Sequence, residues 1–411
     1  MNKRTYFLIL SLWFGLTQTF PPFFFFIPLG QAVTLAIFMA GAGILFPRLL
    51  FRKSMLALYL FTLVNYLLYL SGNKFLDTPN SVIIPFLSMG TPLLLAEYAF
   101  SYDKDGLFVK RLVIVAMVCT IIMAVISIPQ ILLFPNVIRG ASISSSVEDN
   151  SIVEDVSIYY WVINYGSIHG LSILIAPLAY FCRKHFEKKK LSSYFWMLSL
   201  LLIFIVIFLS SATTSLIIAI MMLFLGFFMA YKKLSREMFV KIGLVGFTGF
   251  VLSQPVVLIP VIDFTQSLMI EDSSNYIKMN QLRNSLKSGE AEGDAEARSV
   301  RYDASLDLFL DSPLMGTDRP ESIGRHSFFL DRLALYGLIL IIPLVLVIIL
   351  NLRKMYKWMK TSKVPYFYGV AGSLLMLAFK GDFGESTWFY GFAFLPILCK
   401  YMDNIVNERY R

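Results

Sequence analysis

Apolar runs of about twenty residues recur along the whole sequence, and no other feature limits the possible folds so strongly. A helix of that length crosses the roughly 30 Å of hydrocarbon in a bilayer. Charged residues make up only 15% of the 411 residues, whereas they form about a quarter of a typical soluble domain. The sequence therefore predicts an all-α polytopic membrane protein, with residues 1–411 in a single integral domain.

We expect about 12 transmembrane helices, near residues 5–24, 30–47, 54–72, 82–101, 112–134, 166–182, 193–210, 213–231, 242–260, 329–351, 365–379 and 388–402. Lysine and arginine cluster in alternate connections between these segments, and the positive-inside rule assigns such connections to the cytoplasm. Both termini then face the cytoplasm. The basic groups are short and lie beside the membrane, which favours contact with lipid headgroups and provides no surface for nucleic acid.

Two connections on the outer side are long, residues 135–165 and residues 261–328. Loops of this length in a compact protein usually carry function. We therefore expect the larger one to hold an active site that faces outward.

An amphipathic helix lying at the outer membrane surface is expected within residues 297–310. Its apolar residues recur at helical spacing: Val300, Ala304, Leu308 and Phe309. Arg298 and Arg301 are three residues apart and share one face of this helix. Two neighbouring guanidinium groups can hold a phosphate or diphosphate in bidentate fashion. The alternative is that they anchor headgroups or pair with the aspartates of the same segment.

Two histidines stand where expected spans begin on the outer side, His326 and His169. The neighbouring Arg325 disfavours protonation of His326, which could then accept a proton from a substrate. A structural role is the alternative for both, and His169 is placed to form local hydrogen bonds at a helix start. Asp331 follows closely and enters the membrane boundary.

Glu97 is the one acid deep within an apolar run. A buried carboxylate is costly unless it is paired, so such a residue is a functional candidate. Because it lies near the expected cytoplasmic end, we expect it to reach the interface or to pair with Lys104.

Taken together, two stretches of the outer loop resemble the O-antigen ligase and polysaccharide polymerase superfamily of membrane glycosyltransferases. The likeness covers about 45 residues and extends to the plan of about twelve spans with one large outer loop. The matching residues are Arg298 with Tyr302 and Ala304, then Ser312-Pro313-Leu314-Met315-Gly316, and His326 ten residues before Tyr336-Gly337.

The resemblance implies a GT-C-like helical enzyme that transfers a glycan from an undecaprenyl diphosphate carrier at the outer face of the bacterial cytoplasmic membrane. It implies no metal or other cofactor. Arg298 then holds the diphosphate with Arg301 as its partner, and His326 assists the acceptor hydroxyl. Lipid-linked oligosaccharides are the expected donor and acceptor, with a flippase and a chain-length regulator as protein partners.

The chain departs from the family pattern at residues 210–215, where Thr213 stands in the place of an expected arginine. Arg139 or Arg325 is the candidate to supply the second phosphate contact. Three further residues are candidates for binding substrate: Tyr302, Asp331 and His169.

Three activities remain open at this point. A polymerase that joins repeat units is favoured over a ligase that moves a finished glycan to another acceptor, because the loop is divergent and acidic. A lipid-linked oligosaccharide flippase or transporter would need charges along a central path and internal symmetry. Neither is evident in the expected spans.

Overall fold

Every regular element of the structure, a computed structural model, is helical in the part of the chain that it describes, which confirms the all-α class. The described residues are 2–20, 22–23, 31–73, 76, 78–133, 162–186, 191–210, 212–229, 259–260, 262–263, 266–267, 274–288, 294–380 and 385–407.

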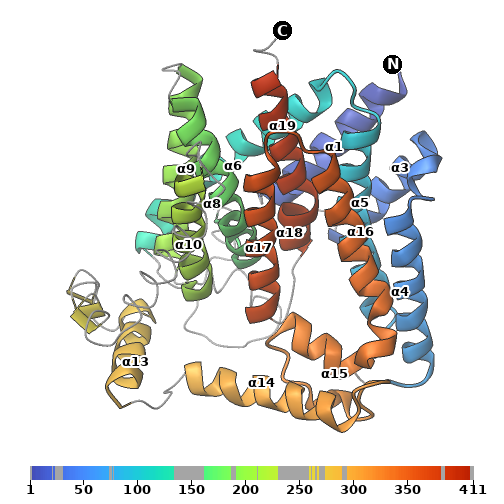
Figure 1. Cartoon of the computed structure of the whole chain (residues 1–411), viewed down its shortest axis with the longest axis vertical. Coiled ribbons are helices and arrows are strands. Elements are labelled where there is room, and N and C mark those ends of the chain that lie inside the picture. Colours follow the sequence, from blue (N-terminus) through green and yellow to red (C-terminus); the bar gives the residue numbers. More distant parts are fainter. Residues whose placement is uncertain are drawn as a thin grey trace, which may run out of the picture.

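Most helices run side by side in one bundle (Figure 1). They are α1 (Lys3–Thr19), α3 (Gln31–Leu45), α4 (Lys53–Leu70), α5 (Asn80–Ser101), α6 (Leu107–Leu133), α8 (Tyr165–Phe186), α9 (Leu191–Leu209), α10 (Thr213–Met229), α16 (Ile342–Trp358), α17 (Lys363–Phe379) and α19 (Leu395–Asn407). The short 3₁₀ turn η1 (Pro47–Leu49) precedes α4, and α18 (Glu385–Trp388) with the π-helical η4 (Phe389–Phe394) leads into α19. The segment expected to span at 388–402 is thus part of a longer helical stretch with a π-helical insertion.

Four helices are long and apolar enough to cross a membrane, namely α4, α5, α6 and most of α8. The bent pair formed by α15 (Phe328–Leu340) and α16 makes a fifth if it is counted as one span. Shorter apolar helices include α3, α9, α10 and α17. These helices agree with a membrane protein, while the expected span 242–260 lies almost wholly outside the described residues.

The centre of the bundle is formed by α5 and α8. About four fifths of the apolar window of each is buried, 78% in α5 and 83% in α8. Other helices expose large apolar side chains on their outward faces, such as Leu60 and Leu201. Outward apolar faces are what a bilayer, rather than water, would cover.

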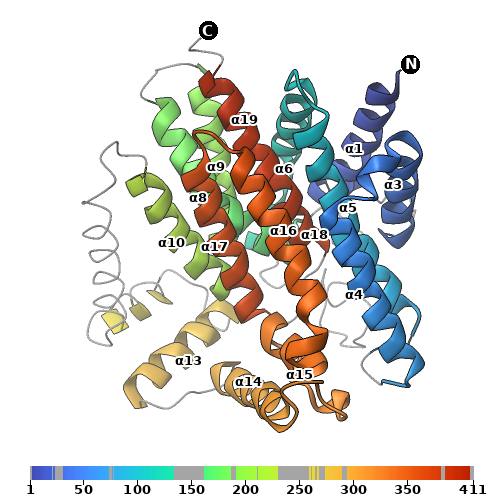
Figure 2. The same ribbon diagram turned by 45° about the vertical axis from the view of Figure 1, so that its right-hand side comes forward.

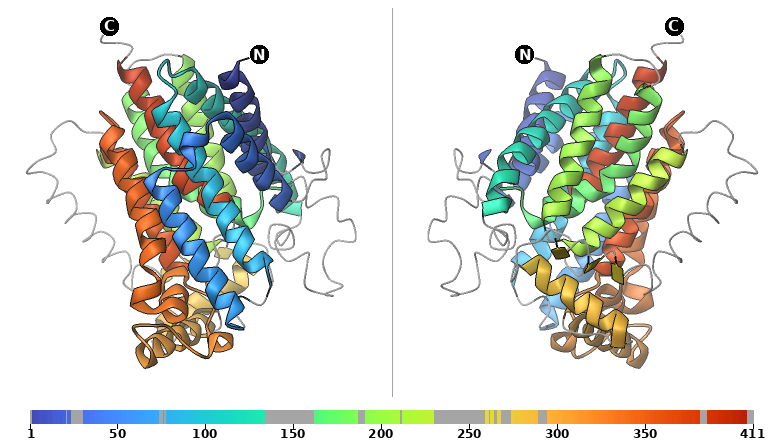
Figure 3. Two further views of the ribbon diagram at one scale, coloured as in Figure 1. Left: turned by 90° about the vertical axis from the view of Figure 1, so that its right-hand side faces the viewer. Right: turned by 90° about the vertical axis from the view of Figure 1, so that its left-hand side faces the viewer.

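Helices α13 (Ser274–Ser288) and α14 (Asp294–Asp311) lie at one end of the bundle, and α14 runs across it (Figures 1 and 2). The start of α1 and the end of α19 lie together at the opposite end (Figure 3). The helix expected within 297–310 is confirmed as α14. Of its four expected apolar residues, Leu308 is buried and Ala304 and Phe309 are partly buried, whereas Val300 is 62% exposed.

The segment expected to span at 329–351 is not one straight helix. It divides into α15 and α16, which meet at an angle of 102°. Within α15, Gly337 leaves the helical conformation with φ 62° and ψ −176°. A positive φ of this kind is readily adopted only by glycine.

The break at Gly337 is held by direct backbone contact with the Ser-Pro-Leu-Met-Gly motif. The N–H of Leu338 donates to the carbonyl of Pro313 at 2.8 Å. A β-carbon placed on Gly337 would lie 2.5 Å from the backbone nitrogen of Gly316, and one on Gly316 would lie 2.2 Å from the carbonyl oxygen of Leu335. The two glycines therefore let two chain segments approach with no side chain between them.

Replacing Gly316 by alanine should destabilise the protein strongly, because the new β-carbon meets backbone that cannot move aside. Gly72→Ala is the matched control, since Gly72 also has positive φ but has open space around it. We expect a cost of about 1 kcal/mol for Gly72→Ala from φ alone and about 2–4 kcal/mol for Gly316→Ala. Thermal unfolding in detergent measures both, and equal losses would contradict the packing argument.

Candidate functional site

Two segments bring the predicted catalytic residues together at the α14 end of the bundle. Helix α14 carries Arg298, Arg301 and Tyr302, and His326 lies in the loop between the 3₁₀ turn η3 (Pro320–Ser322) and α15. The rings of Tyr302 and His326 have centroids 5.9 Å apart. Gly324 allows this approach, because a β-carbon there would lie 2.0 Å from the carbonyl oxygen of Arg301.

A buried carboxylate fixes the loop that carries His326. Asp331, 3% exposed, accepts a hydrogen bond from the hydroxyl of Ser305 at 2.7 Å and one from the N–H of Ser327 at 3.1 Å. The Ser305 hydroxyl in turn accepts the N–H of Gly324 at 3.0 Å. Asp331 thus holds α14, the loop and the start of α15 together.

The same segments close the end of α17. Carbonyl groups in the last turn of a helix have no partner within the helix and need donors from elsewhere. Here the hydroxyl of Ser327 donates to the carbonyl of Ala378 at 2.8 Å, and the N–H of Phe328 donates to that of Lys380 at 2.9 Å. The hydroxyl of Tyr302 donates to the carbonyl of Phe379 at 3.2 Å. Site residues are therefore anchored directly to the bundle.

A second cluster lies beside the first and contains the other predicted histidine. The ammonium group of Lys380 lies 5.3 Å from the centre of the Tyr165 ring, a cation–π contact. The Tyr165 ring meets His169 edge-on, with centroids 4.5 Å apart. Nδ1 of the buried His169 forms a short hydrogen bond of 2.5 Å with the hydroxyl of Ser215. Lys380 joins the two clusters, because its own carbonyl binds Phe328.

The remaining predicted residues differ in how the structure places them. Arg301 and Arg325 are exposed, and Arg325 is the only non-glycine residue with positive φ among the described residues, at 55°. Arg298 lies on α14, but its side chain is outside the described part. Arg139 lies outside the described residues altogether.

Sequence reasoning missed the contribution of Lys380, Tyr165 and Ser215. Ser215 falls in the 210–215 segment where a family arginine was sought, and it faces His169 instead. The sequence does hold a signal for Lys380. This lysine directly follows the apolar run 365–379, in a connection expected on the outer side, where acidic residues otherwise predominate.

A half-buried arginine completes the first cluster. The guanidinium of Arg332 lies 5.5 Å from the centre of the Phe328 ring and 5.9 Å from that of Tyr336. Tyr336 also donates a hydrogen bond to Asn65 of α4 at 2.5 Å. The charge of Arg332 is thus held over aromatic faces at the start of α15, close to the loop of His326.

Comparison of the sequence with protein-family models and with curated proteins finds no match. Within the described residues, no group of three or more histidine, cysteine or acidic side chains is arranged to hold a metal ion. The likeness to O-antigen ligases and polysaccharide polymerases therefore depends on the motifs of this chain alone.

Asp331→Asn should loosen the site, because an amide has one acceptor oxygen where the carboxylate offers two to Ser305 and Ser327. We expect a loss of about 1–3 kcal/mol in stability, the usual cost of stranding a buried donor. Asp307→Asn on the exposed face of α14 is the control and should change little. Thermal unfolding in detergent compares the two, and identical midpoints would mean that Asp331 does not hold the loop.

Proposed function

We propose that the chain is a membrane glycosyltransferase that joins undecaprenyl-diphosphate-linked oligosaccharide repeat units at the outer face of a bacterial cytoplasmic membrane. The observation that carries this proposal is the packing of the His326 loop on α14, the helix that carries Arg301 and Tyr302. Tyr302 in turn binds the end of α17, where Lys380 lies. A histidine on the segment that packs against the helix of Arg298 and Arg301 suits a reaction that removes a proton and releases a diphosphate.

The proposed topology has about 12 spans, both termini in the cytoplasm, and residues 261–328 outside. It is supported by the position of the start of α1 and the end of α19 at the end of the bundle opposite α14 (Figure 3). The last turn of α16 holds Lys357, and Arg353 and Lys354 precede it, as expected for a cytoplasmic boundary. A flippase and a chain-length regulator are the proposed protein partners.

In the proposed reaction an acceptor sugar hydroxyl attacks the anomeric carbon of the donor. A glycosidic carbon–oxygen bond forms, and the bond between the anomeric carbon and the diphosphate oxygen breaks with its electron pair leaving on the diphosphate. His326 accepts the hydroxyl proton. Arg298 and Arg301 stabilise the negative charge that develops on the leaving group.

Lys380 is proposed to supply the second cation in place of the arginine that the family carries near Thr213. Its ammonium group lies over Tyr165, in contact with the His169 and Ser215 cluster that includes the 210–215 segment. The cation therefore comes from the end of α17 rather than from α10. Arg325 and Arg139 are then proposed to bind the sugar or the headgroup of the carrier.

An assay with purified protein distinguishes the proposed polymerase from two other activities. A ligase, which transfers a finished lipid-linked glycan, would form product only when a distinct acceptor is added. A flippase or transporter would move the carrier across a liposome without forming a bond.

Arg298→Ala and His326→Ala should abolish the polymer while the protein still folds. The assay supplies the lipid-linked repeat unit alone to purified protein, and a gel resolves the product ladder. Arg301→Lys should also lower activity sharply, because an ammonium group cannot reproduce the guanidinium fork. His185→Ala in the last turn of α8 is the control and should leave the ladder intact. Full-length polymer from both alanine variants would refute the assignment.

Lys380→Met should reduce polymer formation about 100-fold, the usual effect of removing one group that stabilises developing charge. Lys363→Met is a matched control, because Lys363 begins α17 at its other end and also lies over a tyrosine, 5.6 Å from the Tyr356 ring. Initial rates and melting temperatures are measured for both. If the two variants lose the same activity, Lys380 has no special role in the reaction.

A further inference from the structure

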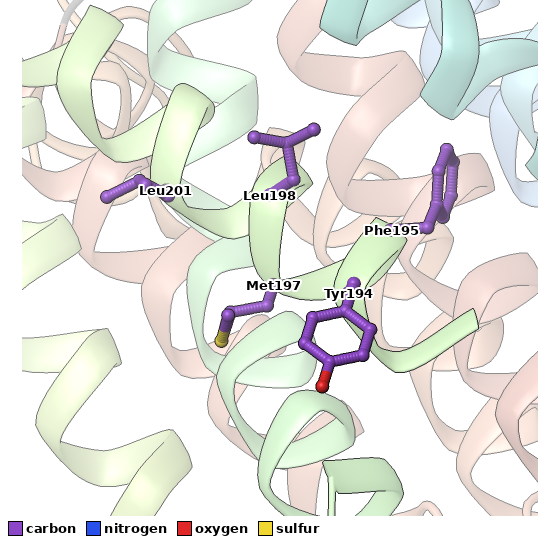
Figure 4. A pocket seen from close by; sticks show the side chains of 5 residues that line it. All are labelled: Tyr194, Phe195, Met197, Leu198 and Leu201. Carbon is purple, nitrogen blue, oxygen red and sulfur yellow. The ribbon is translucent and has the colours of Figure 1, made fainter. Parts of the chain in front are cut away.

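A basic pocket lies at the end of the bundle opposite the candidate site. Its cavity has a volume of about 410 Å³. It lies between the start of α4, the end of α5 and the end of α16, and its lining residues are Arg52, Lys53, Ser54, Glu97, Leu350, Arg353, Lys354 and Lys357. Five cationic side chains thus surround a single carboxylate. A second cavity, about 480 Å³ on α9 (Figure 4), has an almost wholly apolar lining.

Glu97 lies at the base of this pocket and pairs with two of its cations. It is 1% exposed, forms a close ion pair with Lys354, and lies 3.7 Å from Arg52. The partner expected from the sequence was Lys104, but the charge is met by residues from α16 and from the start of α4. Those elements pack against α5, so they reach Glu97 in the bundle interior, whereas Lys104 lies in the exposed connection after α5.

The remaining charge of the pocket is not compensated within the described residues. Lys53, Arg353 and Lys357 are exposed and form no ion pair with a described acidic side chain. The hydroxyl of Ser54 is buried in the wall and has no hydrogen-bond partner in the described part of the chain. Ser54 lies in the first turn of α4, where free backbone N–H groups also favour an anion.

Apolar rows run away from the pocket along both helices that form its mouth. On α4, Leu56 and Leu60 follow Lys53 at spacings of three and seven residues and are 49% and 48% exposed. On α16, Ile349 precedes Arg353 by four residues and is 50% exposed. These spacings place each row on the same helix face as its cation. The surface is therefore charged at one end and apolar along its length.

We infer that this pocket binds the phosphate group of an anionic membrane phospholipid, whose acyl chains lie along the exposed apolar faces of α4 and α16. The pattern of charge and apolar surface matches a molecule with an anionic head and a hydrocarbon tail. Arginine and a helix N-terminus together suit the several acceptor oxygens of a phosphate. The inference does not depend on the proposed glycosyl transfer, because the pocket and the candidate site lie at opposite ends of α16.

The test uses the full-length protein in a neutral detergent, with phosphatidylglycerol or phosphatidylcholine added, and counts retained lipids by native mass spectrometry. Wild-type protein should retain one phosphatidylglycerol in preference to phosphatidylcholine. Lys53→Gln with Lys357→Gln should weaken this about tenfold, because each basic side chain near an anionic lipid contributes to binding. Both residues lie at the pocket rim, so their loss leaves the Glu97 pairs intact.

The matched control is Lys110→Gln with Arg111→Gln, two exposed basic residues in the first turns of α6. It removes the same charge from the same end of the bundle and should not alter lipid retention. A parallel arm measures thermal stability in inorganic phosphate against chloride at equal ionic strength. Stabilisation by inorganic phosphate with no preference between the two lipids would overturn the lipid assignment in favour of a soluble phosphate compound. Equal losses in the two double variants would overturn the site itself.

Discussion

The unsatisfied carbonyl groups at the end of α17 set the arrangement of the whole candidate site. Ala378, Phe379 and Lys380 each obtain a donor from outside the helix, and all three donors come from α14 or from the start of α15. Carbonyl groups at a helix end have no partner within the helix, so the end of α17 favours segments that can donate hydrogen bonds to it. The loop of His326 is therefore positioned by the bundle as well as by its own sequence.

Glycine residues allow these segments to pack closely at two places. Gly324 lets the His326 loop lie directly on the backbone of Arg301, and Gly316 with Gly337 lets the turn after α14 lie on the break within α15. A side chain at any of these positions would separate the segments. The buried Ser305 and Asp331 then fix the spacing that the glycines permit. Close packing and polar pairing thus act on the same few residues.

The helical class and most helix positions follow from the sequence, because long apolar runs and the spacing of apolar residues in α14 are local signals. The division of 329–351 was not predicted, although Gly337 and Pro343 stand within this run. The break at Gly337 depends on its contact with the turn at Gly316, which the local sequence does not show. The partners of Glu97 and the contact of Lys380 with Tyr165 were missed for a related reason. Each depends on which helices become neighbours, and a single sequence does not reveal that.

The bend between α15 and α16 has a consequence for where chemistry can occur. Helix α16 has 17 residues and is about 25 Å long at 1.5 Å per residue, close to the hydrocarbon thickness of a bilayer. Helix α16 therefore sets a fixed distance between the basic pocket at one of its ends and the turn into α15 at the other. A lipid phosphate bound in the pocket would fix how deep α16 lies in the membrane. The residues proposed to react, in the loop before α15, would then be held level with the headgroups of the opposite leaflet.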